Sequence, residues 1–150
     1  MRRNDREIKD RLEIDSIISR ARVCRLALCR DGQPYIVPLC FGYDGKSLYF
    51  HAAKEGMKIE ALMKNSRVCF EMDIDQELVR SGNSCSMRYR SVIGFGRASF
   101  IEDAEGKRLA IEALMRHYEE DPLEWPQEAL AKVAVIKVEI ESLTGKRSGP

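Results

Sequence analysis

The chain is 150 residues long, with 44% hydrophobic and 33% charged residues. This composition is typical of a folded globular domain and argues against intrinsic disorder. Its 25 basic and 24 acidic residues leave a net charge of +1, which is not the strongly basic balance of a nucleic-acid-binding domain. We therefore expect one domain over 1–150, with no nucleic-acid partner and no basic face for a membrane.

The cysteines and histidines bear on location and metal binding. Five cysteines occur in the sequence: Cys24, Cys29, Cys40, Cys69 and Cys85. An odd number, no Cys-x-x-Cys pair and no signal peptide predict reduced thiols and a cytoplasmic protein. No apolar run approaches the roughly 18 residues of a membrane span. Neither His51 nor His117 has ligand-type neighbours at metal-binding spacing, so we expect no metal site, and His117 is predicted to lie on the surface.

The amino-terminal third predicts a helix followed by a hairpin. Residues 10–21 carry apolar side chains at helical spacing. A strand over 22–30 leads into Asp31-Gly32, which is a strong signal for a two-residue hairpin turn, and a second strand is expected over 34–43. Pro38 lies within that second strand and cannot donate a ladder hydrogen bond, so the strand should be at an edge or open there.

The middle of the chain predicts another hairpin, a helix and a half-buried strand. Asp44-Gly45 is the second turn signal, and a strand over 47–53 follows it. A helix is expected over 54–64. Apolar and polar residues then alternate over 68–74, as in a strand with one buried face. The polar segment over 75–85 is predicted to be a loop.

The carboxyl-terminal half predicts two more strands around a helix. A long strand over 87–101 contains Gly94 and Gly96, which indicate a bend, a bulge or a close approach by another group. An amphipathic helix is expected over 107–118, and the last strand over 133–141 ends in a basic tail. Six strands, two tight hairpins and peripheral helices favour an antiparallel barrel over a parallel sheet.

The junction between the strand over 47–53 and the following helix is the first candidate site. Free backbone N–H groups at a helix start favour an anion. Lys54 and Lys58 are four residues apart, so they would share one side of that helix. The junction is either a phosphate cradle or an ordinary turn with solvated lysines, and the residues alone support both equally. No glycine-rich phosphate loop is present.

Two further features leave alternatives open. His51 could be an acid, base or hydrogen-bond donor toward a substrate, because an imidazole titrates near neutral pH, or it could be a barrel histidine bonded to backbone. The segment over 87–91 interleaves basic and aromatic residues. An ordinary strand or a contact to an anionic ligand explains this segment better than a platform for single-stranded nucleic acid, given the neutral charge.

Five segments, in this order along the chain, carry a family resemblance: Arg22-Val-Cys-Arg-Leu-Ala-Leu28, Pro34-Tyr-Ile-Val-Pro-Leu39 with Phe41-Gly-Tyr43, Leu48-Tyr-Phe-His-Ala-Ala-Lys-Glu-Gly56, Ser86-Met-Arg-Tyr-Arg-Ser-Val-Ile-Gly-Phe-Gly-Arg-Ala98 and Leu143-Thr-Gly-Lys146. Each is weak alone, but together they span almost the whole chain. The sequence thereby resembles the pyridoxamine 5′-phosphate oxidase-like flavoproteins, in particular their NimA-like, nitroimidazole-resistance branch.

This resemblance implies a mainly β fold with peripheral helices, a six-stranded antiparallel split β-barrel. It also implies a homodimer that holds one FMN in each of two clefts between the subunits. The residues that it assigns to cofactor binding are Val37, Pro38, Leu39, His51, Ala52, Ala53, Lys54, Lys58, Arg90, Ser91, Val92 and Lys146. Haem and deazaflavin, which related split barrels bind, are the alternative cofactors.

The resemblance also implies roles within that set. Residues 37–39 would run beside the isoalloxazine ring, 51–53 would border the cofactor, and Lys58 with Lys54 would hold its phosphate. Residues 90–92 would reach the cleft from the partner subunit, and Lys146 would close it. The phosphate position coincides with the cradle inferred from the residues themselves, which favours the cradle over the ordinary turn.

The expected function is that of an FMN-dependent oxidoreductase that reduces a small acceptor, with nitroaromatic compounds as candidates. In this family pattern His51 is the catalytic residue that faces the substrate. Ala52 departs from the small hydroxyl residue or glycine that is common at its position, and the carboxyl-terminal signature for vitamin B6 oxidation is not evident. A non-catalytic flavin- or haem-binding protein is the alternative.

Overall fold

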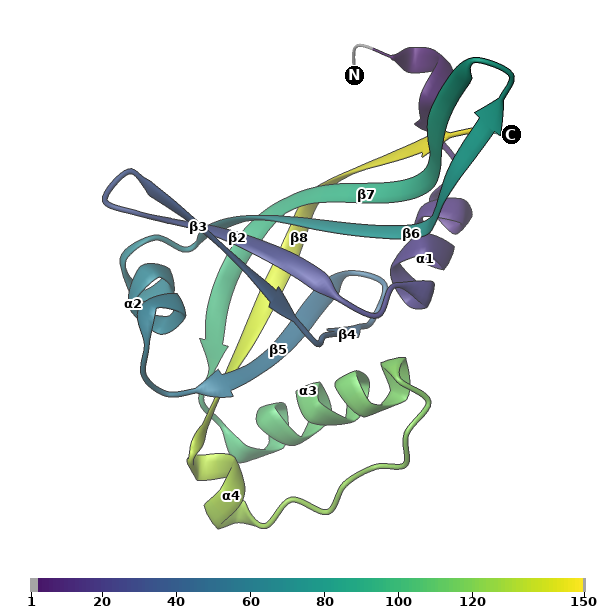
Figure 1. Cartoon of the computed structure of the whole chain (residues 1–150). Coiled ribbons are helices and arrows are strands. Elements are labelled where there is room, and N and C mark those ends of the chain that lie inside the picture. The colour runs from purple at the N-terminus through teal and green to yellow at the C-terminus, as the bar shows by residue number, and fades with distance from the viewer. Residues whose placement is uncertain (1–2, 150) are drawn as a thin grey trace.

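One antiparallel sheet organises the chain, and a computed structural model describes it over residues 3–149. Its eight strands within those residues are β1 (Glu7–Ile8), β2 (Cys24–Arg30), β3 (Gln33–Leu39), β4 (Gly42–Tyr43), β5 (Ser47–Ala53), β6 (Arg67–Ser81), β7 (Ser84–Ile101) and β8 (Val133–Ser148). The helices are α1 (Arg11–Arg20), α2 (Met57–Lys64), α3 (Ala104–His117) and α4 (Gln127–Ala131), preceded by a short 3-10 turn at Asn4–Arg6. The strand order is β3-β2-β6-β7-β8-β5-β4, with β1 paired to β8 (Figure 1).

The sheet closes on itself as a barrel that is open along one line. β3 and β4 lie at opposite ends of the strand order, yet only Cys40 and Phe41 separate them along the chain. The Phe41 backbone N–H donates to the Tyr118 hydroxyl at 3.2 Å and not to a neighbouring strand. The opening therefore lies beside β3, and Pro38 lies in this edge strand as expected, because β3 pairs only with β2.

The side chains that fill the barrel interior account for most of the apolar–polar alternation along the strands. The alternation over 68–74 is confirmed, because Val68, Phe70, Met72 and Ile74 are buried in the main core. Gly94 leaves room for the Phe70 ring, which a side chain at that position would overlap. The register of β7 on β8 shifts between Phe95 and Gly96, where Glu141 of β8 has no partner, so an irregularity beside Gly96 is confirmed.

The hairpin and helix predictions also have clear outcomes. Asp31 and Gly32 join β2 to β3 with φ angles of 51° and 79°. Positive φ angles at both central residues are what a two-residue type I′ hairpin turn requires. α3 and α4 cover the outer face of β5 and β8 (Figure 1), where Ile111, Leu130 and Val135 belong to a second, smaller core. α1 packs against β6 and β7.

Several boundaries differ from the sequence-based expectation. The loop predicted over 75–85 is wrong, since β6 and β7 continue through it as a two-stranded ribbon that turns at 82–83. The strand expected over 34–43 is divided into β3 and β4, and β8 extends through the basic tail. The short strands β1 and β4 bring the number above the six that were expected. His117 was expected at the surface but is half-buried, because its ring packs 4.1 Å from that of Phe41, centroid to centroid.

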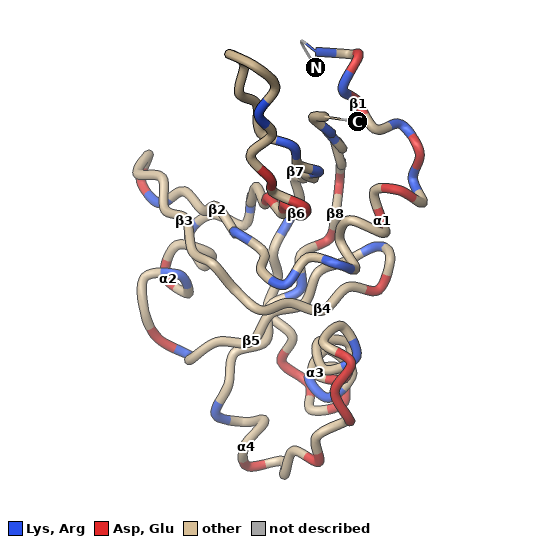
Figure 2. The backbone as a smooth tube through the Cα atoms, turned by 45° about the vertical axis from the view of Figure 1, so that its right-hand side comes forward, with Lys and Arg blue, Asp and Glu red and all other residues tan. Residues whose placement is uncertain are grey.

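Acidic and basic residues are interspersed along β6, β7 and α3 (Figure 2). Many of them are paired across strands. Arg25, for example, contacts Glu71 at 2.9 Å and Asp73 at 2.7 Å. Much of the charge on this part of the sheet surface is thus paired locally.

Candidate functional site

The start of α2 presents backbone donors that no side chain of the helix cap uses. β5 ends at Ala53, and the helix begins after Gly56, whose φ of 116° is in the region that favours glycine. α1 and α3 are capped by the side chains of Asp10 and Asp103, whereas α2 has no side-chain cap. Lys58 lies in the first turn of α2. This end of the barrel can therefore accept an anionic group from a ligand.

Lys58 lies close enough to His51 for its charge to affect the imidazole. Burial, and then the positive charge of Lys58, lowers the pKa of His51 below its ordinary value of 6.5. Burial also lowers the pKa of Lys58. Within residues 3–149 neither side chain forms a hydrogen bond to protein or an ion pair. Near neutral pH the imidazole is thus uncharged and free to bond to a ligand.

Trp125 extends this region, although no pattern in the sequence assigned it to the site. Its ring lies 6.4 Å from that of His51, centroid to centroid, with 60° between the two planes. Trp125 is held by packing against the second core, which contains Leu130 and Val135. The only signal in the sequence was a single tryptophan between Pro122 and Pro126, and that pattern does not reveal which strand it covers.

A second group of the expected residues lies in the middle of β7, beside the carboxyl-terminal end of β8. Ser91 pairs with Lys146 across the two strands, and Arg90 pairs with Arg147. The side chain of Val92 is completely buried in the main core, so only its backbone can reach a ligand. The charge of Arg90 is already engaged within the chain.

The partners of Arg90 are acidic residues from two other elements. Its guanidinium lies 2.9 Å from a carboxylate oxygen of Asp75 and 3.7 Å from one of Glu13. Arg20 contacts the same Asp75 at 2.5 Å, and hydrogen bonds from Arg20 and then Arg90 lower the pKa of that carboxyl. Asp75 itself has a φ of 58° at an irregularity in the β6–β7 pairing.

The two groups of residues do not meet within one chain. His51 pairs with Val135 near the start of β8, whereas Ser91 pairs with Lys146, eleven residues later on the same strand. At about 3.3 Å per residue this is roughly 36 Å along the strand. The remaining expected residues, Val37, Pro38 and Leu39, lie on the edge strand β3, where the Pro38 side chain is exposed.

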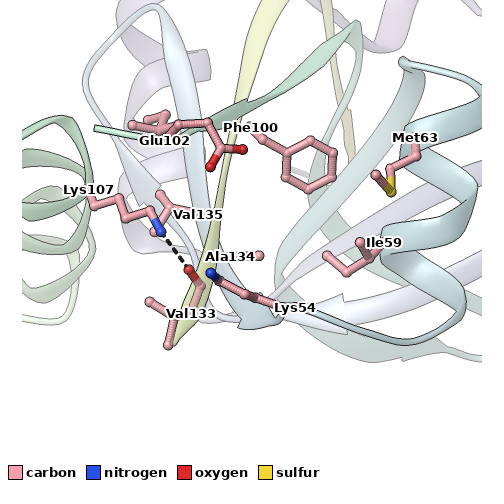
Figure 3. Close-up of a pocket in the computed structure, with 10 residues that line it drawn as sticks. Lys54, Ile59, Met63, Phe100, Glu102, Lys107, Val133, Ala134 and Val135 are labelled. Carbon is pink, nitrogen blue, oxygen red and sulfur yellow. Dashed lines mark hydrogen bonds between the residues drawn. The ribbon is translucent and has the colours of Figure 1, made fainter. Parts of the chain in front are cut away.

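Lys54 does not share a helix side with Lys58. The expectation that it would is wrong, because α2 begins only at Met57 and Lys54 precedes it in the turn. The side chain of Lys54 lines a cavity between α2 and α3 that Lys58 does not border (Figure 3).

Two further properties concern the described part of the chain only. Over residues 3–149, no three or more histidine, cysteine, aspartate or glutamate side chains are grouped so that they could hold a metal ion. No helix in that range has both the length and the apolar character needed to cross a bilayer.

The class of protein follows from this architecture: an antiparallel split barrel with helices outside it and unpaired polar groups at one strand-to-helix junction. A family model described as pyridoxamine 5′-phosphate oxidase matches residues 10–147. The chain belongs to this pyridoxamine 5′-phosphate oxidase-like family.

Solved structures show the same relationship. A candidate 5-nitroimidazole antibiotic resistance protein from Bacteroides thetaiotaomicron is 40% identical, with a TM-score of 0.88 over 94% of this chain and 86% of its own. An FAD-binding protein from Mesorhizobium loti is 28% identical, with a TM-score of 0.70 and coverage of 96% and 98%. An FAD- and haem-binding protein from Mycobacterium smegmatis, 24% identical with a TM-score of 0.83 over 97% and 74%, shares the fold.

Proposed function

We propose that this protein is an FMN-dependent oxidoreductase that reduces small oxidised acceptors, with nitroaromatic compounds as its candidate substrates. The observation that carries the proposal is the 40% identity, over nearly the whole chain, to a candidate 5-nitroimidazole resistance protein. The uncapped start of α2 beside Lys58 and His51 supports it, because this is where a phosphate-bearing cofactor would be held.

The residues at the barrel opening fit a flavin mononucleotide. Ala52 and Ala53 are small and leave the backbone accessible, while the first turn of α2 offers N–H donors and Lys58 offers a positive charge to a phosphate. The exposed Pro38 on β3 cannot pair with another strand, so this edge is available to a flat ring. When bound, FMN would supply the hydride or electron chemistry.

His51 would position the acceptor and hold a proton near it. Because its pKa is lowered, the imidazole is neutral at physiological pH and can donate one hydrogen bond and accept another. Trp125 lies beside it and can form an aromatic wall for a planar substrate. The chain thus contributes orientation and a controlled protonation state to the reaction.

A second copy of the chain would complete the site. The group around Ser91 and Lys146 cannot reach His51 within one chain, since the two lie at opposite ends of β8. The outer face of β7 between them exposes 45% of Ile93 and 52% of Phe95, apolar area that a partner subunit would bury. We therefore include a homodimer with two interfacial sites in the proposal.

The first test is the absorption spectrum of the protein as purified, followed by titration of the apoprotein with FMN and with FAD. The proposal predicts a yellow protein, FMN binding with one site per chain, and reduction of the bound flavin by a nicotinamide donor. Oxidation of that reduced flavin by a 5-nitroimidazole would establish the acceptor class. A protein that binds neither flavin would overturn the proposal.

Other outcomes of that test would support the non-catalytic alternative. The Mycobacterium smegmatis protein with the same fold binds FAD and haem by its description. A haem spectrum, or bound FMN that no nicotinamide donor reduces, would favour a cofactor-binding protein over the FMN-dependent oxidoreductase.

A further inference from the structure

A cavity of about 240 Å³ lies between α2 and α3, at the ends of β7 and β8 (Figure 3). Its walls are mainly apolar and include Ile59 from α2, Phe100 from β7 and Val135 from β8. Three charged side chains also border it: Lys54, Glu102 and Lys107. Neither His51 nor Lys58 lines this space, so it is distinct from the proposed acceptor position.

Lys107 is an unusual residue at such a place, because only 5% of it is exposed. Its ammonium group donates hydrogen bonds to the carbonyl oxygens of Leu130, at 3.1 Å, and Val133, at 2.9 Å. An ammonium group has three N–H donors, so one remains. Within residues 3–149 no carboxylate forms an ion pair with it, which leaves a buried positive charge without a counter-charge.

Lys54 brings a second positive charge to the same space. It projects from the turn after β5, and in Figure 3 its ammonium group and that of Lys107 approach the start of β8 from opposite sides. Lys54 forms no ion pair within the described residues. Glu102 is exposed and does not pair with either lysine. The lysines therefore outnumber the carboxylates around a largely apolar space.

We propose that this cavity binds a small monocarboxylate with an apolar body, such as an aromatic acid. The carboxylate would accept hydrogen bonds from Lys107 and Lys54, and the apolar body would lie against Ile59 and Phe100. The volume corresponds to roughly eight water molecules at about 30 Å³ each, which limits the ligand to the order of ten heavy atoms. Apart from Lys54, the lining residues are not among those that the family resemblance assigns to the flavin, and the proposal does not rest on the proposed function.

The test is calorimetric titration of the purified protein with sodium benzoate and, separately, with benzamide. The two molecules have the same shape, but only benzoate carries a charge. We expect one saturable benzoate site per chain and affinity for benzamide lower by about tenfold, the value of one charge-assisted hydrogen bond. Equal affinity for the two probes, or no benzoate binding, would overturn the proposal.

Two variants locate the site. Lys54→Gln should weaken benzoate binding by about tenfold. Lys132→Gln removes the same charge next to Val133, from a residue that does not line the cavity, and should leave benzoate affinity within about twofold. Equal loss in both variants would indicate general electrostatic attraction and would overturn the proposal.

A competition experiment separates this site from that of the cofactor. Benzoate affinity should be the same with and without saturating FMN, because Lys58 and the start of α2 lie outside the cavity. Displacement of benzoate by FMN would assign Lys54 to the flavin phosphate and would overturn an independent site while leaving the proposed function in place.

Discussion

Lys58 at the start of α2 and Arg90 in the middle of β7 were expected to serve the same cofactor, yet their surroundings differ. Lys58 has no ion pair in the described chain, and burial lowers its pKa. Arg90 contacts Asp75 at 2.9 Å and Glu13 at 3.7 Å. The first positive charge is uncompensated and therefore available to a ligand, whereas the second already stabilises contacts among α1, β6 and β7.

This difference shows what a basic residue in a family pattern does and does not establish. A matching position indicates that the charge is near a site, but only the neighbouring carboxylates show whether that charge is free. On this basis the start of α2 is the stronger anion site, and the Arg90 region requires either a partner subunit or release from Asp75 before it can bind a phosphate.

The largest expected effect is on the stability of the fold, at the β7–β8 strand pair that lies between the start of α2 and Arg90. Gly96→Ala would place a Cβ well inside contact distance of the Glu139 carbonyl oxygen at the bulge. We expect a loss of about 2–3 kcal/mol in the free energy of unfolding, measured by urea denaturation. Ser99→Ala, an exposed position of the same strand, should change it by less than about 0.5 kcal/mol. A Gly96→Ala protein of native stability would contradict the close approach.

The next effect is on cofactor binding alone. Lys58→Met should raise the Kd for FMN by roughly tenfold to a hundredfold, because it removes one charge-assisted contact to the phosphate. Stability should stay within about 0.5 kcal/mol, since no ion pair is lost. Lys64→Met, in the last turn of the same helix, serves as the control and should bind FMN like the wild type. Flavin fluorescence titration distinguishes these outcomes.

Arg90→Met tests the second region of the comparison, where the positive charge is already paired with carboxylates. Removing its contacts with Asp75 and Glu13 should lower the free energy of unfolding by about 1 kcal/mol or less, because these groups are partly exposed. The loss should shrink at about 1 M salt, where screening is strong. Unchanged stability with a large rise in the FMN Kd would instead place Arg90 in the cofactor site, and the contrast with Lys58 would then be wrong.

The smallest expected effect is on how the free energy of unfolding depends on pH. It falls in two separate pH windows, an upper one set by His51 and a lower one to which Asp75 contributes. The pKa of His51 is lowered from 6.5, so the unfolded chain binds more protons than the folded one just below that value. Stability contributed by the neutral imidazole is therefore complete above pH 6.5 and decreases as the pH falls below it. The pKa of Asp75 is lowered from 3.8, so its contribution is present above that value and is lost only at more acidic pH.

Urea unfolding as a function of pH measures both windows. His51→Gln should reduce the upper one. Asp75→Asn should reduce the lower one only in part, because the pKa values of Asp44 and Asp73 are also lowered. His117, whose pKa burial also lowers, must be replaced in parallel so that its share can be subtracted. Emission from Trp125, the single tryptophan, should follow His51 protonation with a midpoint below 6.5. An upper window that survives both histidine replacements would contradict this assignment.

The sequence predicted those parts of the fold in which burial decides the structure. The alternation from Val68 to Ile74 has one face in the core, and the Asp31-Gly32 turn depends on local φ angles, so both signals are present in the residues themselves. The ribbon over 75–85 was missed because the strands there are held mainly by pairing with each other. Neither face is covered by a core, so the segment is mostly polar and even Leu78 is exposed, which leaves no regular alternation to indicate a strand.

The site could be predicted only in part for a similar reason. His51 and Lys58 lie near one another in sequence, and their closeness follows from one strand and one helix. Trp125 reaches His51 through the packing of α3 and α4 on β8, which no local pattern contains. The orientation of Lys54 depended on where α2 begins, and Gly56 placed that start three residues later than expected.

The central claim is that one cofactor site combines the start of α2 from one chain with the residues around Ser91 and Lys146 from another chain. The most direct measurement is FMN binding by a heterodimer co-expressed from Lys58→Met and Lys146→Met chains with different tags. Each variant alone should bind FMN poorly. The heterodimer carries one site with both changes and one with neither, so we predict one FMN bound per pair at wild-type affinity. A heterodimer that binds no better than the single variants, or a wild-type chain that is monomeric when loaded with FMN, would contradict the account.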